Sequence, residues 1–292
     1  MSPSSRSSLL KRGVLERRAV TMSRDGADVP DAATWGIAVE APVEIALNGT
    51  PWTVMLATPA DVEDLAVGLA LTEGVLRDAH AVQHVAVSEF LHDISVNLVV
   101  PEHQLNADAV RARSLLSNTG CGLCGLESLA QLHQRAPRAA VASSVEIADA
   151  AIAAAFAALP AHQPIFRETH SVHAAAWCEP DGTPVLVRED VGRHNALDKL
   201  MGALARRDML AQPGFVVMSS RCSYELVYKA AVANTLLLAT ISAPTSMALE
   251  WSAALALPLA CCFRSAGETR VVRFASEQTV PVGPTSGAAD GS

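Results

Sequence analysis

Apolar and polar positions alternate in the first third of the chain, which is the pattern of strands with one buried face. Asn48-Gly49 separates two such stretches, and this dipeptide readily takes the positive φ values that a tight hairpin turn needs. The pattern therefore predicts a hairpin followed by two further strands. The predicted strands are residues 43–47, 52–57, 82–87 and 94–100.

Helix signals follow the predicted hairpin. Thr58 is suited to cap a helix N-terminus, Pro59 suits the first helical position and Gly74 suits a stop. We therefore predict a helix over residues 59–73, and a short helix after Asn106.

Strand-like and helix-like stretches alternate over the second half of the chain, which predicts a layered α/β domain with helices packed on a sheet. The predicted strands are residues 172–177, 185–188, 214–219, 257–263 and 269–274, and the predicted helices are residues 126–135, 145–159, 195–205, 224–238 and 246–254. The apolar run at residues 226–241 is interrupted by Lys229 and is shorter than the roughly 18 uncharged residues of a membrane span. We interpret this run as a buried helix.

The chain divides by composition into five parts. Its two ends are rich in Ser, Gly, Pro or Arg and poor in bulky apolar residues, so both are expected to be disordered. The parts are a tail at 1–30, a hairpin-and-helix lobe at 31–115, a mobile Cys-x-x-Cys loop with its following helix at 116–137, an α/β core at 138–276 and a tail at 277–292.

The charge balance narrows the class of ligand. The 292 residues carry a formal net charge of −8, so the surface as a whole has the wrong sign for nucleic acid, and an anionic ligand must be held by a local cluster of cations. The basic N-terminal stretch has no continuous apolar segment of a signal peptide. We therefore expect a cytoplasmic protein whose six cysteines are reduced.

The first candidate site is a glycine-rich stretch, residues 118–125, that contains Cys121 and Cys124. Its glycines leave both sulfurs unshielded, and a helix expected just after the loop places Cys124 near the positive end of a helix dipole. Such a setting lowers a thiol pKa from its usual value of about 8.5 and favours the reactive thiolate. We expect the pair to be chemically active rather than packed in a core.

Three chemistries remain open for this cysteine pair: zinc ligation, dithiol redox chemistry and carriage of sulfur as a persulfide. Zinc needs about four ligands, yet the chain has no second Cys-x-x-Cys, and none of its nine histidines has the Glu two places later that a zinc deaminase uses. A thioredoxin-like pair would follow directly on a strand, whereas polar residues 117–119 precede this one. No metal site is expected.

Further polar clusters stand where a predicted strand gives way to a predicted helix, at residues 188–199, 219–229 and 242–246. At the carboxyl ends of strands, helix N-terminal amides together with Arg, His and Ser can hold a phosphate group. Three simpler interpretations of these clusters compete with a phosphate-binding site. Residues 188–199 could be ion pairs that satisfy one another, Ser223 could be a helix cap, and His173 could be a core residue.

Several short motifs occur in a fixed order along the chain. They are Thr72-Glu73-Gly74, Cys121-Gly122-Leu123-Cys124-Gly125, His173-Ala174-Ala175, residues 188–199, Ser220-Arg221-Cys222-Ser223 with Glu225 and Lys229, and Ala243-Pro244-Thr245-Ser246. Together these motifs resemble the FdhD family over roughly residues 36–274. The resemblance implies a fold similar to the cytidine deaminase-like fold for the α/β core, beside a smaller N-terminal β-rich lobe.

The resemblance also implies an activity. It predicts a sulfurtransferase that accepts sulfane sulfur from a cysteine desulfurase as a persulfide on Cys121, with Cys124 assisting. The sulfur would pass to the bis-molybdopterin guanine dinucleotide of formate dehydrogenase, bound as a substrate, with no permanently bound cofactor. A homodimer is expected, with no nucleic-acid or membrane partner. The alternative is a cofactor-binding chaperone in which the cysteine pair is structural or binds a metal.

The implied cofactor contacts include a segment that departs from the family pattern. The family typically has Phe-Ala-Arg-Gly-Gly-Arg there, whereas this chain lacks the double glycine and carries its second arginine at Arg270; Cys222 also stands where a small residue is usual. Arg193, Arg221 and Arg264 are expected to offset phosphate charge. The predicted cofactor-binding residues are Cys262, Phe263, Arg264, Ser265, Ala266, Gly267, Arg193, His194, Ser220 and Arg221.

Overall fold

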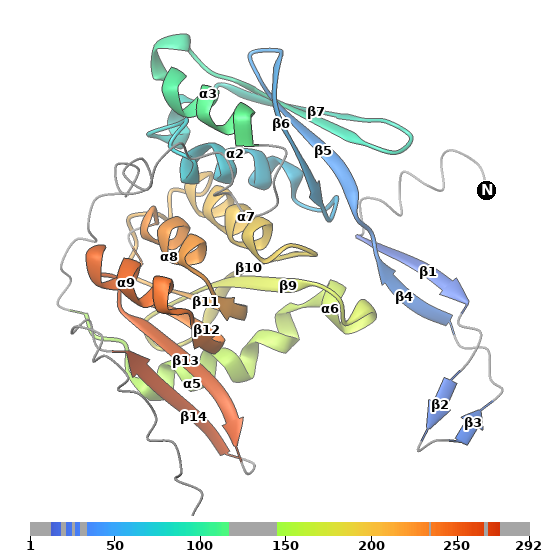
Figure 1. Ribbon diagram of the computed structural model, residues 1–292, viewed down its shortest axis with the longest axis vertical. Helices are drawn as coiled ribbons and strands as arrows, with labels where there is room; N and C mark the ends of the chain where they lie inside the picture. The colour runs from blue at the N-terminus through green and yellow to red at the C-terminus, as the bar shows by residue number, and fades with distance from the viewer. Residues whose placement is uncertain are drawn as a thin grey trace, which may run out of the picture.

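The computed structural model shows a mixed α/β chain with two main sheets and helices packed between and around them (Figure 1). Among the helices that it describes, none is long and apolar enough to cross a membrane. The structure describes residues 13–18, 22–24, 27–29, 34–116, 145–233, 235–265 and 268–274.

A four-stranded sheet forms the N-terminal part, in the order β6-β5-β8-β7. The predicted hairpin is confirmed: β5 and β6 are joined by Asn48 and Gly49, whose φ values of 50° and 81° are those of a tight turn. One face of this sheet buries its apolar side chains against helix α2. The elements are β5 (Ala41–Leu47), β6 (Thr50–Ala57), α2 (Val62–Thr72), η1 (Ala79–Ala81), β7 (His84–Glu89), β8 (Ile94–Val99), η2 (Glu102–Gln104) and α3 (Ala107–Leu116).

A six-stranded sheet forms the C-terminal part, in the order β10-β9-β11-β12-β13-β14. Its strands are β9 (His173–Cys178), β10 (Pro184–Asp190), β11 (Phe215–Cys222), β12 (Leu238–Pro244), β13 (Leu259–Ser265) and β14 (Glu268–Phe274). Because β9 is antiparallel to both β10 and β11, and β11, β12 and β13 are parallel, the strands β10, β11, β12 and β13 all point the same way. Their carboxyl ends and the amino end of β9 therefore share one side of the sheet, which we call the C-edge.

Alternate residues of the central strands face opposite layers of helices. Ala175 and Trp177 of β9 pack with α7 (Arg193–Ala205), α8 (Tyr224–Ala231) and α9 (Ser246–Ala254), and Ala174 and Ala176 pack with α5 (Asp149–Ala158). The short η3 (Leu159–His162) and α6 (Pro164–Thr169) connect α5 to β9. The prediction of a layered α/β chain is confirmed.

Helices α2 and α7 touch through their backbones and so join the two sheets. A Cβ atom on Gly68 would lie 1.7 Å from the carbonyl oxygen of Asp198, and one on Gly202 would lie 1.9 Å from that of Asp64. No side chain larger than hydrogen fits at either position. The helix pair can therefore approach this closely only because both residues are glycine.

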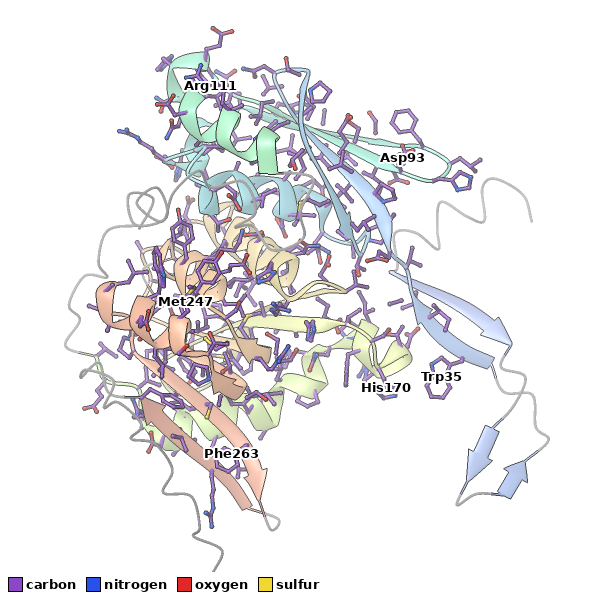
Figure 2. The ribbon with its side chains drawn as sticks, in the orientation of Figure 1. Trp35, Asp93, Arg111, His170, Met247 and Phe263 are labelled. Atoms are coloured by element: carbon purple, nitrogen blue, oxygen red, sulfur yellow. The ribbon has the colours of Figure 1, made fainter. Side chains whose placement is uncertain are left out.

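Two small ribbons precede the main sheets. Strand β1 (Val14–Arg18) pairs with β4 (Thr34–Ala38), and β2 (Met22–Arg24) pairs with β3 (Ala27–Val29). Trp35 of β4 lies beside His170 at the end of α6, with ring centroids 6.2 Å apart (Figure 2). Residues 14–18, which lie in the predicted N-terminal tail, pair with β4.

Two helix predictions are wrong at particular residues. Helix α2 begins at Val62 rather than at 59, because Thr58 bonds to the Asp190 loop instead of capping the helix. The apolar run at 226–241 is not one helix: α8 ends at Ala231 and β12 begins at Leu238. A fully buried strand and a buried helix both have a continuous apolar sequence, so the periodicity of apolar residues does not distinguish them. The predicted helix at 126–135 lies outside the described residues.

We predict that Gly68→Ala lowers the free energy of unfolding by roughly 3 kcal/mol or more, because the new methyl group displaces α7 from α2. Chemical denaturation measures this change. The control is Gly49→Ala, whose Cβ meets open space although φ is 81°, so that it measures backbone strain alone and should cost about 1 kcal/mol. Equal losses in the two variants would contradict the close-contact explanation.

Candidate functional site

The C-edge brings together clusters that are far apart in the sequence. Asp190, the last residue of β10, is paired with His173 at the start of β9. The backbone N–H of Ala174 donates to Ser219 Oγ of β11 at 2.7 Å, and the N–H of Thr245 after β12 donates to the carbonyl of Cys222 at 3.1 Å. Helices α7, α8 and α9 all begin at this edge, so their partly positive N-terminal ends point toward it.

A buried ion pair fixes the turn from β10 into α7. Lys199 Nζ lies 2.6 Å from Asp190 Oδ2, and both side chains are fully buried. The carboxylate of Asp190 also accepts hydrogen bonds from the backbone of Thr58 at 3.0 Å, the backbone of Gly192 at 2.8 Å and the side chain of Asn195 at 3.0 Å. Every polar atom of this carboxylate is therefore engaged within the protein, which makes Asp190 a structural residue rather than a ligand contact.

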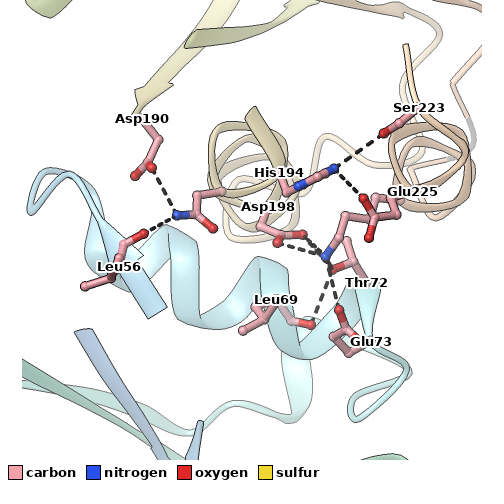
Figure 3. Close-up of polar contacts among 11 residues, drawn as sticks. Leu56, Leu69, Thr72, Glu73, Asp190, His194, Asp198, Ser223 and Glu225 are labelled. Carbon is pink, nitrogen blue, oxygen red and sulfur yellow. Dashed lines mark hydrogen bonds and ion pairs between the residues drawn. The ribbon is translucent and has the colours of Figure 1, made fainter. Parts of the chain in front are cut away.

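A second buried cluster ties α8 to α7 and α2 (Figure 3). Lys229 Nζ lies 2.9 Å from both carboxylate oxygens of Asp198, and the hydroxyl of Thr72 donates to Asp198 Oδ1 at 2.6 Å. Glu73 approaches the same ammonium group at 3.3 Å. Burial raises the pKa of Asp198, and the opposing attraction of Lys229 lowers it. The cluster fixes the position of α8, whose first turn contributes to the C-edge.

His194 lies at the start of α7 and faces the start of α8. Its Nε2 lies 2.7 Å from Glu225 Oε2 and 3.4 Å from Ser223 Oγ (Figure 3). Ser223 occupies the N-cap position of α8 as predicted, yet its hydroxyl makes no capping hydrogen bond. The His194 and Glu225 side chains retain exposures of 25% and 18%, so this contact remains open to solvent and to a ligand.

The other candidate residues at the C-edge differ in exposure. Arg193 is half-buried, Arg221 is exposed and Ser220 is buried. His173 is also half-buried, and burial is the main cause that lowers its pKa, with the positive charge of Arg193 adding to the effect. The C-edge therefore has two arginines, Arg193 and Arg221, and a histidine, His173, whose lowered pKa favours the neutral imidazole.

Most charged side chains of the stretch at 188–199 are paired with other groups of the protein, which supports the ion-pair interpretation for that part. Arg188 Nη2 lies 2.7 Å from the buried carboxylate of Asp64 on α2. Glu189 accepts hydrogen bonds from the backbone of Ile165 at 2.9 Å and of Phe166 at 2.8 Å. These contacts leave Arg193 and His194 as the members of the stretch that can meet a ligand.

The C-terminal half of β13 forms a hairpin with β14. Cys262 is buried, whereas Phe263 is 40% exposed (Figure 2). Phe263 is paired with Arg270 across the hairpin. Arg264 and Ser265 continue the strand. The side chains of these two residues, together with Ala266 and Gly267, lie outside what the structure describes. Their predicted contacts with the cofactor remain predictions.

The described cysteines are all buried: Cys178, Cys222, Cys261 and Cys262. Burial raises the pKa of Cys178 and of Cys222 to about 12, so these two stay protonated and unreactive at neutral pH. Cys121 and Cys124 lie outside the described residues. Within the described part of the chain, no group of three or more His, Cys, Asp or Glu side chains could hold a metal ion.

The sequence alone does not show that Thr58 and Glu225 contribute to the C-edge. Thr58 has the helix-cap signal, yet its hydroxyl accepts a hydrogen bond from the N–H of Val191 at 3.1 Å. Glu225 belongs to a recognised motif, but only the fold shows that it faces His194. No local pattern could have indicated either contact, because each joins residues on different elements.

The chain is similar to known proteins over most of its length. Residues 38–278 match the model of the FdhD/NarQ family. A protein of Xanthomonas euvesicatoria named Sulfur carrier protein FdhD is 45% identical over 260 residues, 88% of this chain and 89% of that one. A protein of the same name from Chromobacterium violaceum is 46% identical over 85% of this chain and 92% of that one.

A solved structure has a similar fold. The crystal structure of a protein from Desulfotalea psychrophila, described as a formate dehydrogenase accessory protein, covers 89% of this chain and 96% of its own with a TM-score of 0.65. The two sequences are 21% identical, so this likeness shows the shared architecture alone.

We predict that the imidazole of His173 titrates below the ordinary histidine pKa of 6.5, because burial and Arg193 disfavour its charged form. In the unfolded chain the same ring binds a proton more readily, so acidification through this range favours unfolding. The stability that His173 contributes is present above its unfolded pKa and is lost as the pH falls. Histidine NMR titration measures the pKa, and His173→Asn should flatten the fall in stability below pH 6.5. An NMR midpoint above that value would contradict the prediction.

Proposed function

The chain belongs to the FdhD/NarQ family, and on that premise we propose that it is a sulfur carrier that enables formate dehydrogenase activity. The observation that carries this proposal is its close similarity, over most of both chains, to proteins named sulfur carriers. The proposed donor is a cysteine desulfurase, the proposed recipient is formate dehydrogenase and the proposed compartment is the cytoplasm.

Sulfur loading is proposed to occur on Cys121. The thiolate of Cys121 attacks the outer sulfur of the desulfurase persulfide, and the bond to the desulfurase cysteine breaks. The desulfurase leaves as a thiolate, and Cys121 then carries the sulfane sulfur as its own persulfide. The sulfur atoms undergo no net oxidation or reduction in this exchange, so loading needs no external oxidant or reductant.

Sulfur delivery is proposed to involve Cys124. Its thiolate attacks the inner sulfur of the Cys121 persulfide, which forms a Cys121–Cys124 disulfide and expels sulfide. The two thiols supply the two electrons that reduce the sulfane sulfur. Alternatively, attack on the outer sulfur moves it to Cys124 and onward without a change in oxidation state.

The burial of the described cysteines supports this assignment. Cys178 and Cys222 have pKa values of about 12 and cannot form thiolates at neutral pH, and Cys261 and Cys262 are also buried. A reactive thiol must be accessible to a large partner protein. Cys121 lies between two glycines and Cys124 precedes a third, which suits that requirement.

The C-edge is proposed to bind the bis-molybdopterin guanine dinucleotide as a substrate. This cofactor carries several phosphate charges, and the C-edge offers Arg193, Arg221, His194 and helix N-termini in a chain whose net charge is −8. Cys262, Phe263, Arg264, Ser265, Ala266, Gly267 and Ser220 complete the proposed contacts.

The proposed organisation has two lobes, residues 31–115 and 138–276, each built on one sheet, and two copies of the chain in a homodimer. The larger lobe is proposed to have the cytidine deaminase-like arrangement, in which the cysteine pair has lost its zinc partners. A deaminase activity is disfavoured because no His-x-Glu is present.

A second candidate is a chaperone that holds the cofactor while the cysteine pair is structural or binds a metal. The convergence of cations at the C-edge would serve such a protein equally well. Zinc content and thiol labelling separate the two. A sulfur carrier has far less than one zinc per chain and labels at Cys121 and Cys124, whereas stoichiometric zinc with protected thiols supports the chaperone.

We predict that Cys121→Ala abolishes both persulfide formation and activation of formate dehydrogenase without unfolding the protein. Incubation with a desulfurase and cysteine, followed by mass spectrometry, measures the added sulfur. Cys222→Ala is the control, because its buried thiol, with a pKa of about 12, should take up no sulfur and its loss should leave loading unchanged. Normal activation by folded Cys121→Ala would refute the assignment.

We predict that GDP binds and that its affinity falls as salt rises, because salt screens the charges of Arg193 and Arg221 at the C-edge. Arg193→Ala and Arg221→Ala should each weaken binding, by roughly tenfold for a charge-assisted contact. Titration at two ionic strengths measures the effect, with Arg111→Ala on α3 as a control far from the C-edge. Unchanged affinity in both edge variants would leave the ion-pair interpretation of the clusters standing.

A further inference from the structure

The proposed function leaves Glu225 without a role, although its carboxylate lies against a predicted cofactor-binding residue. Glu225 Oε2 is 2.7 Å from Nε2 of His194, and the hydroxyl of Tyr224 donates to Oε1 at 3.4 Å. Tyr224 in turn packs against Trp251 of α9, with ring centroids 6.2 Å apart. The carboxylate is therefore held from two sides, and it reaches from α8 to α7.

This contact determines which nitrogen of His194 carries a proton. A carboxylate only accepts hydrogen bonds, so Nε2 must be the donor. Ser223 also approaches Nε2, at 3.4 Å. Among the described residues Nδ1 has no hydrogen-bond partner. The neutral ring therefore leaves Nδ1 as a bare acceptor, and Nδ1 can donate only after it takes up a second proton.

The contacts of the charged side chains at the C-edge distinguish His194 from its neighbours. Asp190 of β10 is fully engaged by Lys199, and Asp198 by Lys229 of α8. Arg193 contributes a fixed positive charge. His173 of β9 has its pKa lowered, mainly by burial and against the opposing effect of Asp190, and it makes no hydrogen bond or ion pair with a carboxylate among the described residues. Of these two imidazoles at the C-edge, it is His194 that has a carboxylate to balance an added positive charge.

We propose that Glu225 is a positioning residue that holds the His194 ring so that Nδ1 gains a proton and donates to a phosphate oxygen when a nucleotide binds. The inference rests on the proposed nucleotide-binding function of the C-edge. The proton comes from solvent: one N–H bond forms at Nδ1, Nε2–H stays on Glu225, and no other covalent bond changes. Binding of the nucleotide is then coupled to proton uptake.

Calorimetric titration of GDP into the full chain tests this coupling. Measurements in buffers of different ionisation enthalpy, above the ordinary pKa of histidine, give the number of protons taken up. Ionisation of GDP itself contributes equally to every variant, so differences between variants isolate the protein. The wild-type chain should take up more protons than His194→Asn or Glu225→Ala, and both variants should bind GDP roughly tenfold more weakly.

Two further variants separate charge from geometry. Glu225→Gln keeps an acceptor for Nε2–H but loses the negative charge, so it should preserve the ring tautomer while reducing proton uptake. Glu250→Gln removes an exposed carboxylate of α9 and should match the wild-type protein. The ¹⁵N spectrum of His194 reports the tautomer without any ligand. It should show Nε2–H in the wild-type protein and in Glu225→Gln, whereas both tautomers should appear in Glu225→Ala.

Failure of the proposed role of Glu225 and failure of the proposed nucleotide site give different results. Equal proton uptake by the wild-type and Glu225→Ala proteins, or an Nδ1–H tautomer in the wild-type protein, overturns the role of Glu225 while the nucleotide site stands. Absence of GDP binding by the wild-type protein contradicts the nucleotide site and this inference with it. Sulfur loading of Cys121, measured separately, is unaffected by either result.

Discussion

The backbone contact between α2 and α7 is the constraint on which the rest of the structure depends. Gly68 and Gly202 let the two helices approach until the space beside each Cα is filled by a carbonyl group of the other helix. This contact joins α2, which packs on the four-stranded sheet, to α7, which packs on the six-stranded sheet. Because α7 begins at the C-edge, its placement also determines where Arg193 and His194 lie.

Buried ion pairs then fix the direction of each element at this edge. Lys199 and Asp190 hold the β10–α7 turn, and Lys229 and Asp198 hold α8 against α7. Buried pairs of this kind add little net stability, since desolvation opposes their attraction, but an alternative register would leave a charge unpaired. We therefore attribute to them a specific arrangement of the edge rather than its stability.

Features encoded by neighbouring residues could be predicted from the sequence. The Asn48-Gly49 turn follows from local backbone preference, and strand-to-helix alternation indicated the layered architecture. Thr58 was assigned wrongly because a distant carboxylate, Asp190, binds its backbone. Strand β12 was missed because buried strands and buried helices share an unbroken apolar pattern.

The candidate site was predicted as separate clusters, and only the topology of the sheet shows that they share one edge. The parallel order of β11, β12 and β13 places residues 219–223 beside 242–246, and the contact of Glu225 with His194 depends on the relative position of two helices, which no spacing in the sequence encodes.

The central claim is that this edge is where the anionic part of the cofactor binds. The crystal structure of the protein with GDP is the most direct measurement. We expect phosphate oxygens within hydrogen-bond distance of Arg193 and Arg221, beside the start of α7 and α8. GDP bound away from the C-edge, for example on the four-stranded sheet, would contradict it.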